Sequence, residues 1–224
     1  MGRRSSHTPQ QLRALVLGAA EEIIEAQGLA GLSAREIARR IGYSPGTIYN
    51  IFANLDDVVL NVEGRVLDAL DERLGAAQQG AGDTPTENAA ERLVRIARAY
   101  LSFAQEKPRL WNLLLEHHMP PGAELPPWYG QKLEGLTTQI ELALAPQFLP
   151  GSEAERQKAA RALWAGVHGI ASLSTADKLS VVTPETAGYL IDNLVGVYLA
   201  GLSRQGREES GDHGGPPPGR PAVP

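Results

Sequence analysis

The sequence predicts an all-α protein of about nine helices. Apolar residues recur at helical spacing through most of the chain, no run alternates apolar and polar residues as a strand does, and glycine or proline separates the periodic segments. With 224 residues, 42% of them hydrophobic and 21% charged, the chain can bury a sizeable core. It contains no cysteine, which excludes disulfides, thiolate zinc sites and a cysteine nucleophile.

The first two helices are predicted within residues 10–42. The first spans 10–28, where leucine, valine, alanine and isoleucine share one face and Gly28 supplies a stop. Ser33 and Glu36 predict a capping box at the start of the second, because each side chain can accept from a free backbone amide of the other. We expect that second helix to end at Gly42.

A very short third helix is predicted to follow the turn at Gly42 and Tyr43, with Ser44 as its cap and Pro45 at its first position. Four apolar residues recur at the spacing of a buried helical face and are predicted to lie in the core: Ile37, Ile41, Ile48 and Phe52. The opposite face is then left with hydroxyls and an amide, from Ser44, Thr47, Tyr49 and Asn50. Such groups suit phosphate oxygens and base edges, so this helix-turn-helix arrangement indicates binding to double-stranded DNA.

Further helices are predicted along the rest of the chain, with a proline-rich loop at 119–128. They span 56–80, 84–106, 109–118, 129–145, 153–175 and 184–204. The last 19 residues contain five glycines and five prolines, which predicts a disordered tail. We therefore expect a DNA-binding domain at 1–55, a ligand-binding and dimerisation domain at 56–205, and the tail at 206–224.

The run "SAREIARRIGYSPGTIYNIFANLDDVV" resembles the signature of the tetracycline repressor (TetR) family of bacterial regulators. The resemblance covers about residues 10–65 and rests on Ile37-Ala38, Gly42, Ser44, Gly46-Thr47, Tyr49 and Phe52. It implies that Thr47 and Tyr49 contact phosphates and that Ser44 contacts the DNA backbone. Gly46 has no side chain, so the protein backbone can come close to the DNA there. Arg35, Tyr43 and Asn50 are further candidates, Asn50 for a base edge.

One position departs from the family pattern. Leu55 stands where the family usually carries a lysine just before its long fourth helix, so one expected phosphate contact is missing. The charge of residues 1–55 is only modestly positive, with six arginines and four glutamates, in a chain of net charge −5. Arg3 and Arg4 offer a compensating flexible arm.

A single head makes few DNA contacts, so we expect a homodimer that reaches successive major grooves. Small residues in the 156–175 helix and an apolar stripe in the 186–202 helix predict a four-helix interface, the alternative being an ordinary intramolecular core. The residues assigned to the interface are Ala162, Gly166, Gly169, Leu190, Leu194, Val197 and Tyr198. The run 163–173, "LWAGVHGIASL", resembles a Trp-His-Gly type of C-terminal domain in the same family.

Large aromatic side chains and histidines gather in the middle helices and predict a pocket for a small-molecule effector, although each could also belong to the core. The candidates are Tyr100, Phe103, Trp111, His117, Trp128, Trp164 and His168. The adjacent His117 and His118 diverge on a helix, so we expect no metal site and no cofactor.

The sequence predicts a cytoplasmic, ligand-responsive regulator, most simply a repressor that a small molecule releases from its operator. No stretch approaches the roughly 18 apolar residues that a membrane span needs. No phosphate loop, G-x-S-x-G or H-E-x-x-H motif indicates an enzyme. Two alternatives remain: a helical small-molecule-binding protein or enzyme that retains the helix-turn-helix head, and a scaffold that binds another protein.

Overall fold

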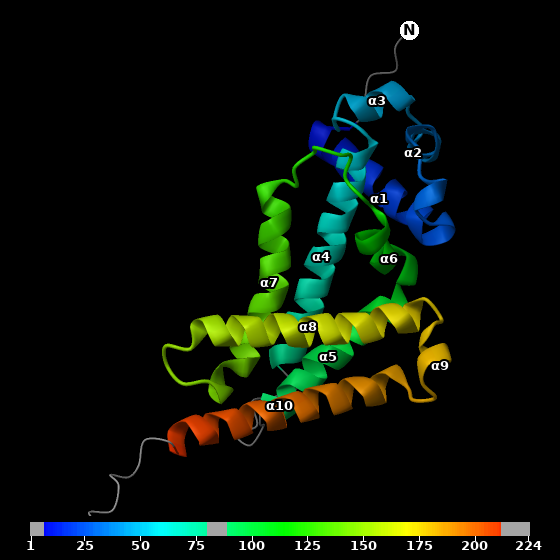
Figure 1. The fold of residues 1–224 in the computed structure, drawn as a ribbon. Coiled ribbons are helices and arrows are strands. Elements are labelled where there is room, and N and C mark those ends of the chain that lie inside the picture. Colours follow the sequence, from blue (N-terminus) through cyan, green and yellow to red (C-terminus); the bar gives the residue numbers. More distant parts are fainter. Residues whose placement is uncertain (1–6, 80–88, 212–224) are drawn as a thin grey trace, which may run out of the picture.

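A computed structural model describes residues 7–79 and 89–211 and shows an all-helical chain (Figure 1). Over these residues it forms ten α-helices and two short 3-10 turns, and no strand. The helices are α1 (Pro9–Gln27), α2 (Ala34–Ile41), α3 (Pro45–Tyr49), α4 (Leu55–Gln79), α5 (Ala89–Glu106), α6 (Pro108–Glu116), α7 (Pro127–Leu144), α8 (Glu153–Thr175), α9 (Leu179–Val182) and α10 (Ala187–Gly211). The 3-10 turns are η1 (Leu29–Gly31) and η2 (Ala145–Gln147).

The expected helices are present, most with small shifts at their ends, and the expected start of the helix at 84–106 lies outside the described residues. The all-α prediction is confirmed, and the additional helix is α9, a single turn that the sequence pattern missed. The helix α10 continues to Gly211, six residues into the segment that we expected to be a tail. The remainder of that predicted tail, like Arg3 and Arg4, lies outside the described residues.

Helix starts in the head are set by side chains that bond free amides. The hydroxyl of Thr8 accepts from the amide of Gln11, whose side chain accepts from the Thr8 amide, a capping box that we had not predicted. At α2, Ser33 accepts from the Glu36 amide at 3.2 Å, but the expected return bond is absent because the Glu36 carboxylate binds arginines. Gly42 ends α2 at φ 74°, ψ 31°, a left-handed conformation that glycine adopts without strain.

The helices α1, α2 and α3 form a small head, from which α4 runs into the body (Figure 1). Within the body, α4 packs against α5 and α7, and α8 packs against α5, α7 and α10. One hydrophobic core runs without interruption from Ile23 and Ile37 in the head to Leu163 and Ile191 in the body. The helix α4 therefore packs against the head at one end and against the body along the rest of its length.

Candidate nucleic-acid interface and effector cavity

The short helix α3 is anchored from behind by its apolar side chains. Ile48 and Phe52 are buried together with Ile37, while Ile41 is half-buried against the same core. On the other side Tyr49 is 53% exposed and Asn50 is also exposed. The helix therefore directs its polar face to solvent.

The remaining predicted contacts lie at the start of α3. Ser44 and Gly46 are exposed and Thr47 is half-exposed, so the surface that begins at Ser44 continues to Asn50. Ser44 is the N-cap residue of α3 as predicted, but the expected side-chain cap is absent, because its hydroxyl lies 3.0 Å from the Thr47 hydroxyl and makes no bond to a backbone amide. A side chain on Gly46 would meet only the Ser44 oxygen, at 3.9 Å, so the backbone at Gly46 faces open space.

Tyr43 has a partner that sequence reasoning missed. Its hydroxyl lies 2.7 Å from Nδ1 of His7, just before α1, with the two rings 6.0 Å apart. This contact ties the segment before α1 to the turn between α2 and α3. His7 carries no sequence signal that would have identified it, because 36 residues separate it from Tyr43.

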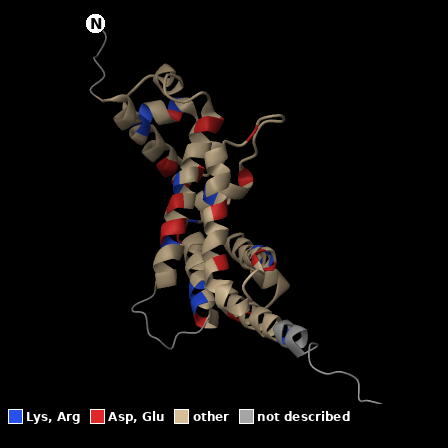
Figure 2. Cartoon of the chain, turned by 90° about the vertical axis from the view of Figure 1, so that its left-hand side faces the viewer, with Lys and Arg blue, Asp and Glu red and all other residues tan. Residues whose placement is uncertain are grey.

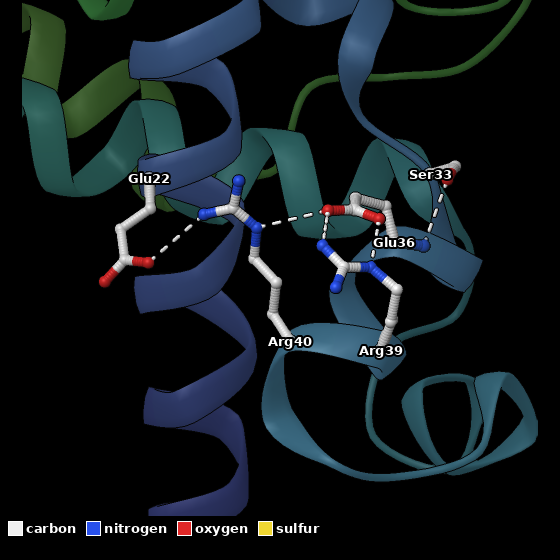
Figure 3. Close-up of polar contacts among 5 residues, drawn as sticks. All are labelled: Glu22, Ser33, Glu36, Arg39 and Arg40. Atoms are coloured by element: carbon white, nitrogen blue, oxygen red, sulfur yellow. Dashed lines mark hydrogen bonds and ion pairs between the residues drawn. The ribbon is translucent and has the colours of Figure 1, made fainter.

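Two of the head arginines are neutralised by glutamates. The carboxylate of Glu36 accepts from Arg39 at 2.7 and 2.8 Å and from Arg40 at 3.3 Å, and Arg40 also reaches Glu22 (Figure 3). Hydrogen bonds from Arg39 and Arg40 lower the pKa of Glu36 to about 2, so this group stays ionised at neutral pH. The cluster therefore reduces the net positive charge on the surface of the head.

The other two arginines of the described head, residues 7–54, differ in role. Arg13 is structural, since it donates to the Ile51 carbonyl and to Asn61 and lies 4.3 Å from the centre of the Phe52 ring. Arg35 is exposed and, alone among these four arginines, has no carboxylate or carbonyl partner. In the view of Figure 2, Lys and Arg alternate with Asp and Glu along the helices of the described body.

Leu55, at the position of the missing lysine, is the first residue of α4 and packs, half-buried, against the core. The helix start around it is held by reciprocal bonds: the Asp57 amide donates to Asn54 Oδ1 at 2.8 Å, and the Ala53 amide donates to Asp57 Oδ2 at 2.9 Å. The first turn of α4 is therefore anchored without a basic side chain.

A cavity of about 600 Å³ lies between α4, α5, α6, α7 and α8. Five of the predicted pocket residues line it: Tyr100, Trp111, His117, Trp164 and His168. Phe103 does not, because it faces a separate groove with Glu21 and Arg65. Trp128 also lies outside the cavity, since it packs over Gly64, where an added methyl group would come within 2.8 Å of the indole.

Four rings form the inner wall of this cavity. Trp164 stacks on His168 with 5.0 Å between centroids, and Trp111 meets Tyr100 edge-on at 4.9 Å. The Tyr100 hydroxyl lies 2.7 Å from Nδ1 of His168. Burial raises the pKa of Tyr100 and lowers the pKa of His168, so both groups favour their neutral forms.

Glu63 on α4 is a cavity residue that the sequence analysis missed. It is 2% exposed and its Oε1 lies 2.9 Å from Nδ1 of His117, at the end of α6. The other ring nitrogen of His117 lies 3.5 Å from Asp56 Oδ1, in the first turn of α4. Burial raises the pKa of Glu63, and His117 acts in the opposite direction. A glutamate on the apolar face of α4, between Val59 and Leu67, was the sequence signal that could have revealed it.

The residues assigned to a dimer interface divide into two groups. Ala162, Gly169 and Val197 are exposed on α8 and α10, Val197 at 65%. Leu190, Leu194 and Tyr198 are half-buried against the core of their own chain. Gly166 packs against Leu194 within one protomer, since a methyl group there would lie 2.7 Å from Leu194 Cδ2. The packing of Gly166 is therefore explained inside the monomer, while the exposed group is available for pairing.

Two family profiles match the chain. The profile described as "Bacterial regulatory proteins, tetR family" matches residues 16–62, and "Tetracyclin repressor-like, C-terminal domain" matches residues 93–197. The first covers most of the head and the start of α4, and the second covers α5 to α10 in large part. The resemblance of 163–173 to a Trp-His-Gly type stays a prediction.

Curated relatives agree with these profiles. The HTH-type transcriptional regulator Rv1816 of Mycobacterium tuberculosis is 25% identical over 131 residues, which make up 58% of this chain and 53% of that protein. The chain thus spans about half the length of this relative. The HTH-type transcriptional regulator EthR of Mycobacterium tuberculosis is 23% identical over 167 residues, or 68% of this chain and 73% of EthR.

Solved structures share the fold. A protein of unknown function from Rhodococcus sp. RHA1 superposes with a TM-score of 0.70 and 22% identity, over 90% of this chain and 100% of that one. A tetR-family transcriptional regulator from Streptomyces coelicolor superposes with a TM-score of 0.65 and 18% identity, over 95% and 87%. No helix in the described part of the chain is both long and apolar enough to cross a membrane. Because both profiles and the curated relatives agree, the chain belongs to the tetracycline repressor (TetR) family of transcriptional regulators.

Proposed function

We propose that the chain is a dimeric DNA-binding regulator, acting in the cytoplasm as a repressor that a small molecule releases from its operator. The observation that carries the proposal is the two-sided helix α3, with Ile48 buried and Tyr49 and Asn50 exposed. A helix of five residues gains little by holding polar side chains out to water. In the major groove of DNA, the same polar side chains would find hydrogen-bond partners on phosphates and bases.

On this proposal, Thr47 and Tyr49 contact phosphates and fix the position of the head, while Asn50 reaches a base edge. Ser44, Gly46 and Tyr43 complete the surface, and Arg35 adds a positive charge that has no carboxylate partner within residues 7–54. Two heads of a homodimer would contact half-sites about 34–36 Å apart. The exposed residues Ala162, Gly169 and Val197 support a pairing face on α8 and α10.

The cavity provides the site for an effector. Its apolar and aromatic walls, with a few polar groups, are typical of small-molecule pockets. Because α4 lines the cavity and carries the head, an effector that requires a different tilt of α4 would move the two recognition helices. Coupling of about 1–3 kcal/mol, or roughly 5–150-fold in DNA affinity, is typical of such linked sites.

A footprint on the DNA that flanks the protein's own coding region tests DNA binding and gives the half-site spacing. In quantitative gel shifts we expect Tyr49→Ala and Thr47→Ala to weaken binding, while Thr138→Ala, at an exposed position of α7, serves as a control. Unchanged DNA affinity in both head variants would move the assignment to a helical small-molecule-binding protein that retains the head. Conversion to a monomer by Val197→Glu, but not by Leu142→Glu at an exposed leucine of α7, would support the pairing face.

A further inference from the structure

The effector cavity contains one unusual group, the carboxyl of Glu63. Among residues whose side chains the structure describes, Glu63 is the one polar or charged residue classed as buried, at 2% exposure. No lysine or arginine lines the cavity. The carboxyl lies 2.9 Å from His117 Nδ1, and Tyr129, which also lines the cavity, acts to lower its pKa. Burying a carboxyl group costs free energy unless hydrogen-bond donors lie next to it. The Glu63 carboxyl therefore offers a hydrogen-bond acceptor to any molecule that enters the cavity.

The polar groups of the cavity do not suit an anionic head group. A carboxylate or phosphate entering beside Glu63 would place two acidic groups at short range, in surroundings that screen charge poorly. The histidines offer little compensation. His117 already faces Glu63 at 2.9 Å and Asp56 at 3.5 Å. Burial lowers the pKa of His168, which is bonded to Tyr100, and Nδ1 of His118 lies 2.8 Å from the Glu116 carbonyl. These contacts disfavour an acid as the occupant.

A protonated amine has the complementary chemistry. An ammonium group carries three donors and a positive charge, which satisfy a buried carboxylate directly. The rest of the cavity is lined by leucines and rings, which favour an apolar body. Those apolar residues include Leu60, Leu67, Leu70, Leu114, Leu133 and Leu136.

We propose that the effector is an apolar amine whose ammonium group binds Glu63 in place of His117. This inference rests on the proposed function, in which the cavity is the effector site. His117 also lies 3.5 Å from Asp56 in the first turn of α4. When the amine takes over Glu63, His117 loses its closer partner on α4, and the end of α6 is released from the helix that carries the head.

Three probes with one chain and different head groups test the inference: 1-decylamine, 1-decanol and decanoate. Binding to the full chain can be followed by tryptophan fluorescence, because Trp111 and Trp164 line the cavity. We expect the amine to bind at least about tenfold more tightly than the alcohol, as for one hydrogen bond to a charged group, and decanoate to bind most weakly.

Two matched variants test whether Glu63 causes the preference for the amine over the alcohol. Glu63→Gln keeps the shape of the side chain and removes its charge, so it should reduce decylamine affinity to that of decanol and leave decanol binding unchanged. Glu72→Gln removes an exposed carboxylate from the same helix and should preserve the preference. Circular dichroism melts of both variants establish that the fold is retained.

Equal or tighter binding of decanoate, no binding of any probe, or a preference that survives Glu63→Gln would overturn the inference. DNA binding by the ligand-free protein is measured separately in the gel shift. A failure there would refute the proposed regulator while leaving the amine preference intact. Normal DNA binding without an amine preference would refute only the effector class.

Discussion

The hydroxyl of Tyr100 on α5 lies 2.7 Å from Nδ1 of His168 on α8, inside the wall of the cavity. The bond joins two helices 68 residues apart in the chain. In the neutral imidazole, Nδ1 can accept from the hydroxyl, and burial of the ring lowers the pKa of His168. Protonation of His168 at Nδ1 would abolish this acceptor, so the contact depends on pH.

This relationship predicts an acid-side loss of stability. Because the pKa of His168 is lower in the folded protein than the ordinary 6.5, the unfolded chain binds the proton more tightly. The contribution of His168 to the free energy of unfolding is fully present above pH 6.5, and it is lost as the pH falls toward the pKa of His168 in the folded protein. Thermal melts at about pH 7.5 and about pH 5.5 should therefore show a smaller loss for His168→Gln than for the wild type.

Tyr100→Phe is the control for this experiment, since it removes the hydroxyl and keeps the ring that buries His168. At the higher pH, Tyr100→Phe should lower the free energy of unfolding by about 0.5–1.5 kcal/mol, the usual net value of a hydrogen bond. The stability of this variant should still depend on pH. An identical acid-side loss in the wild type and His168→Gln would contradict the assignment to His168.

Phe52 should be the anchor of the recognition helix. It is 1% exposed and its ring is covered by Arg13, so Phe52→Ala should lower the free energy of unfolding by about 3–5 kcal/mol. The exposed variant Tyr49→Ala should change stability by less than about 0.5 kcal/mol. Urea unfolding measures both, and equal losses would mean that the two faces of α3 were assigned in reverse.

Leu55→Lys should strengthen DNA binding by restoring a phosphate contact at the start of α4. One added contact steepens the dependence of log affinity on log salt by about 0.9. The affinity of wild type and variant for the same operator fragment should be measured across several salt concentrations. Because Leu55 is half-buried, melting temperatures should accompany the series. Parallel salt slopes would show that a lysine here does not reach a phosphate.

Two glycines of α8 should respond differently to the same substitution. Gly166→Ala places a methyl group 2.7 Å from Leu194 Cδ2, whereas nothing lies within 4 Å of a methyl group on Gly169. Gly169→Ala should be more stable than Gly166→Ala by about 1–3 kcal/mol, the cost of overpacking. If Gly169 lies at the pairing face, its alanine variant should also dimerise more weakly in sedimentation experiments. Equal stability of the two variants would show that the Leu194 side chain can move aside without a loss in the free energy of unfolding.

Much of the head could be predicted because its determinants are local. Apolar spacing separates Ile48 and Phe52 from Tyr49 and Asn50, and the need for a left-handed residue places the end of α2 at Gly42. The hydrogen-bond partners that individual polar side chains choose were less predictable. Ser44 bonds Thr47, and Glu36 bonds arginines, because several partners lie within reach of each group and geometry selects among them.

The sequence by itself determined most of the helices and the two faces of α3, since periodicity and capping act over a few residues, and its helix-turn-helix motif indicated the family. It missed the single turn of α9 and the last residues of α10. Only the tertiary structure decided which aromatics face the cavity, that Trp128 covers Gly64, and that Glu63 meets His117. Such contacts join side chains more than 50 residues apart, and their pairing depends on how helices pack, which local patterns do not encode. For the same reason, the exposed and intramolecular residues of α8 and α10 became distinguishable only in the folded chain.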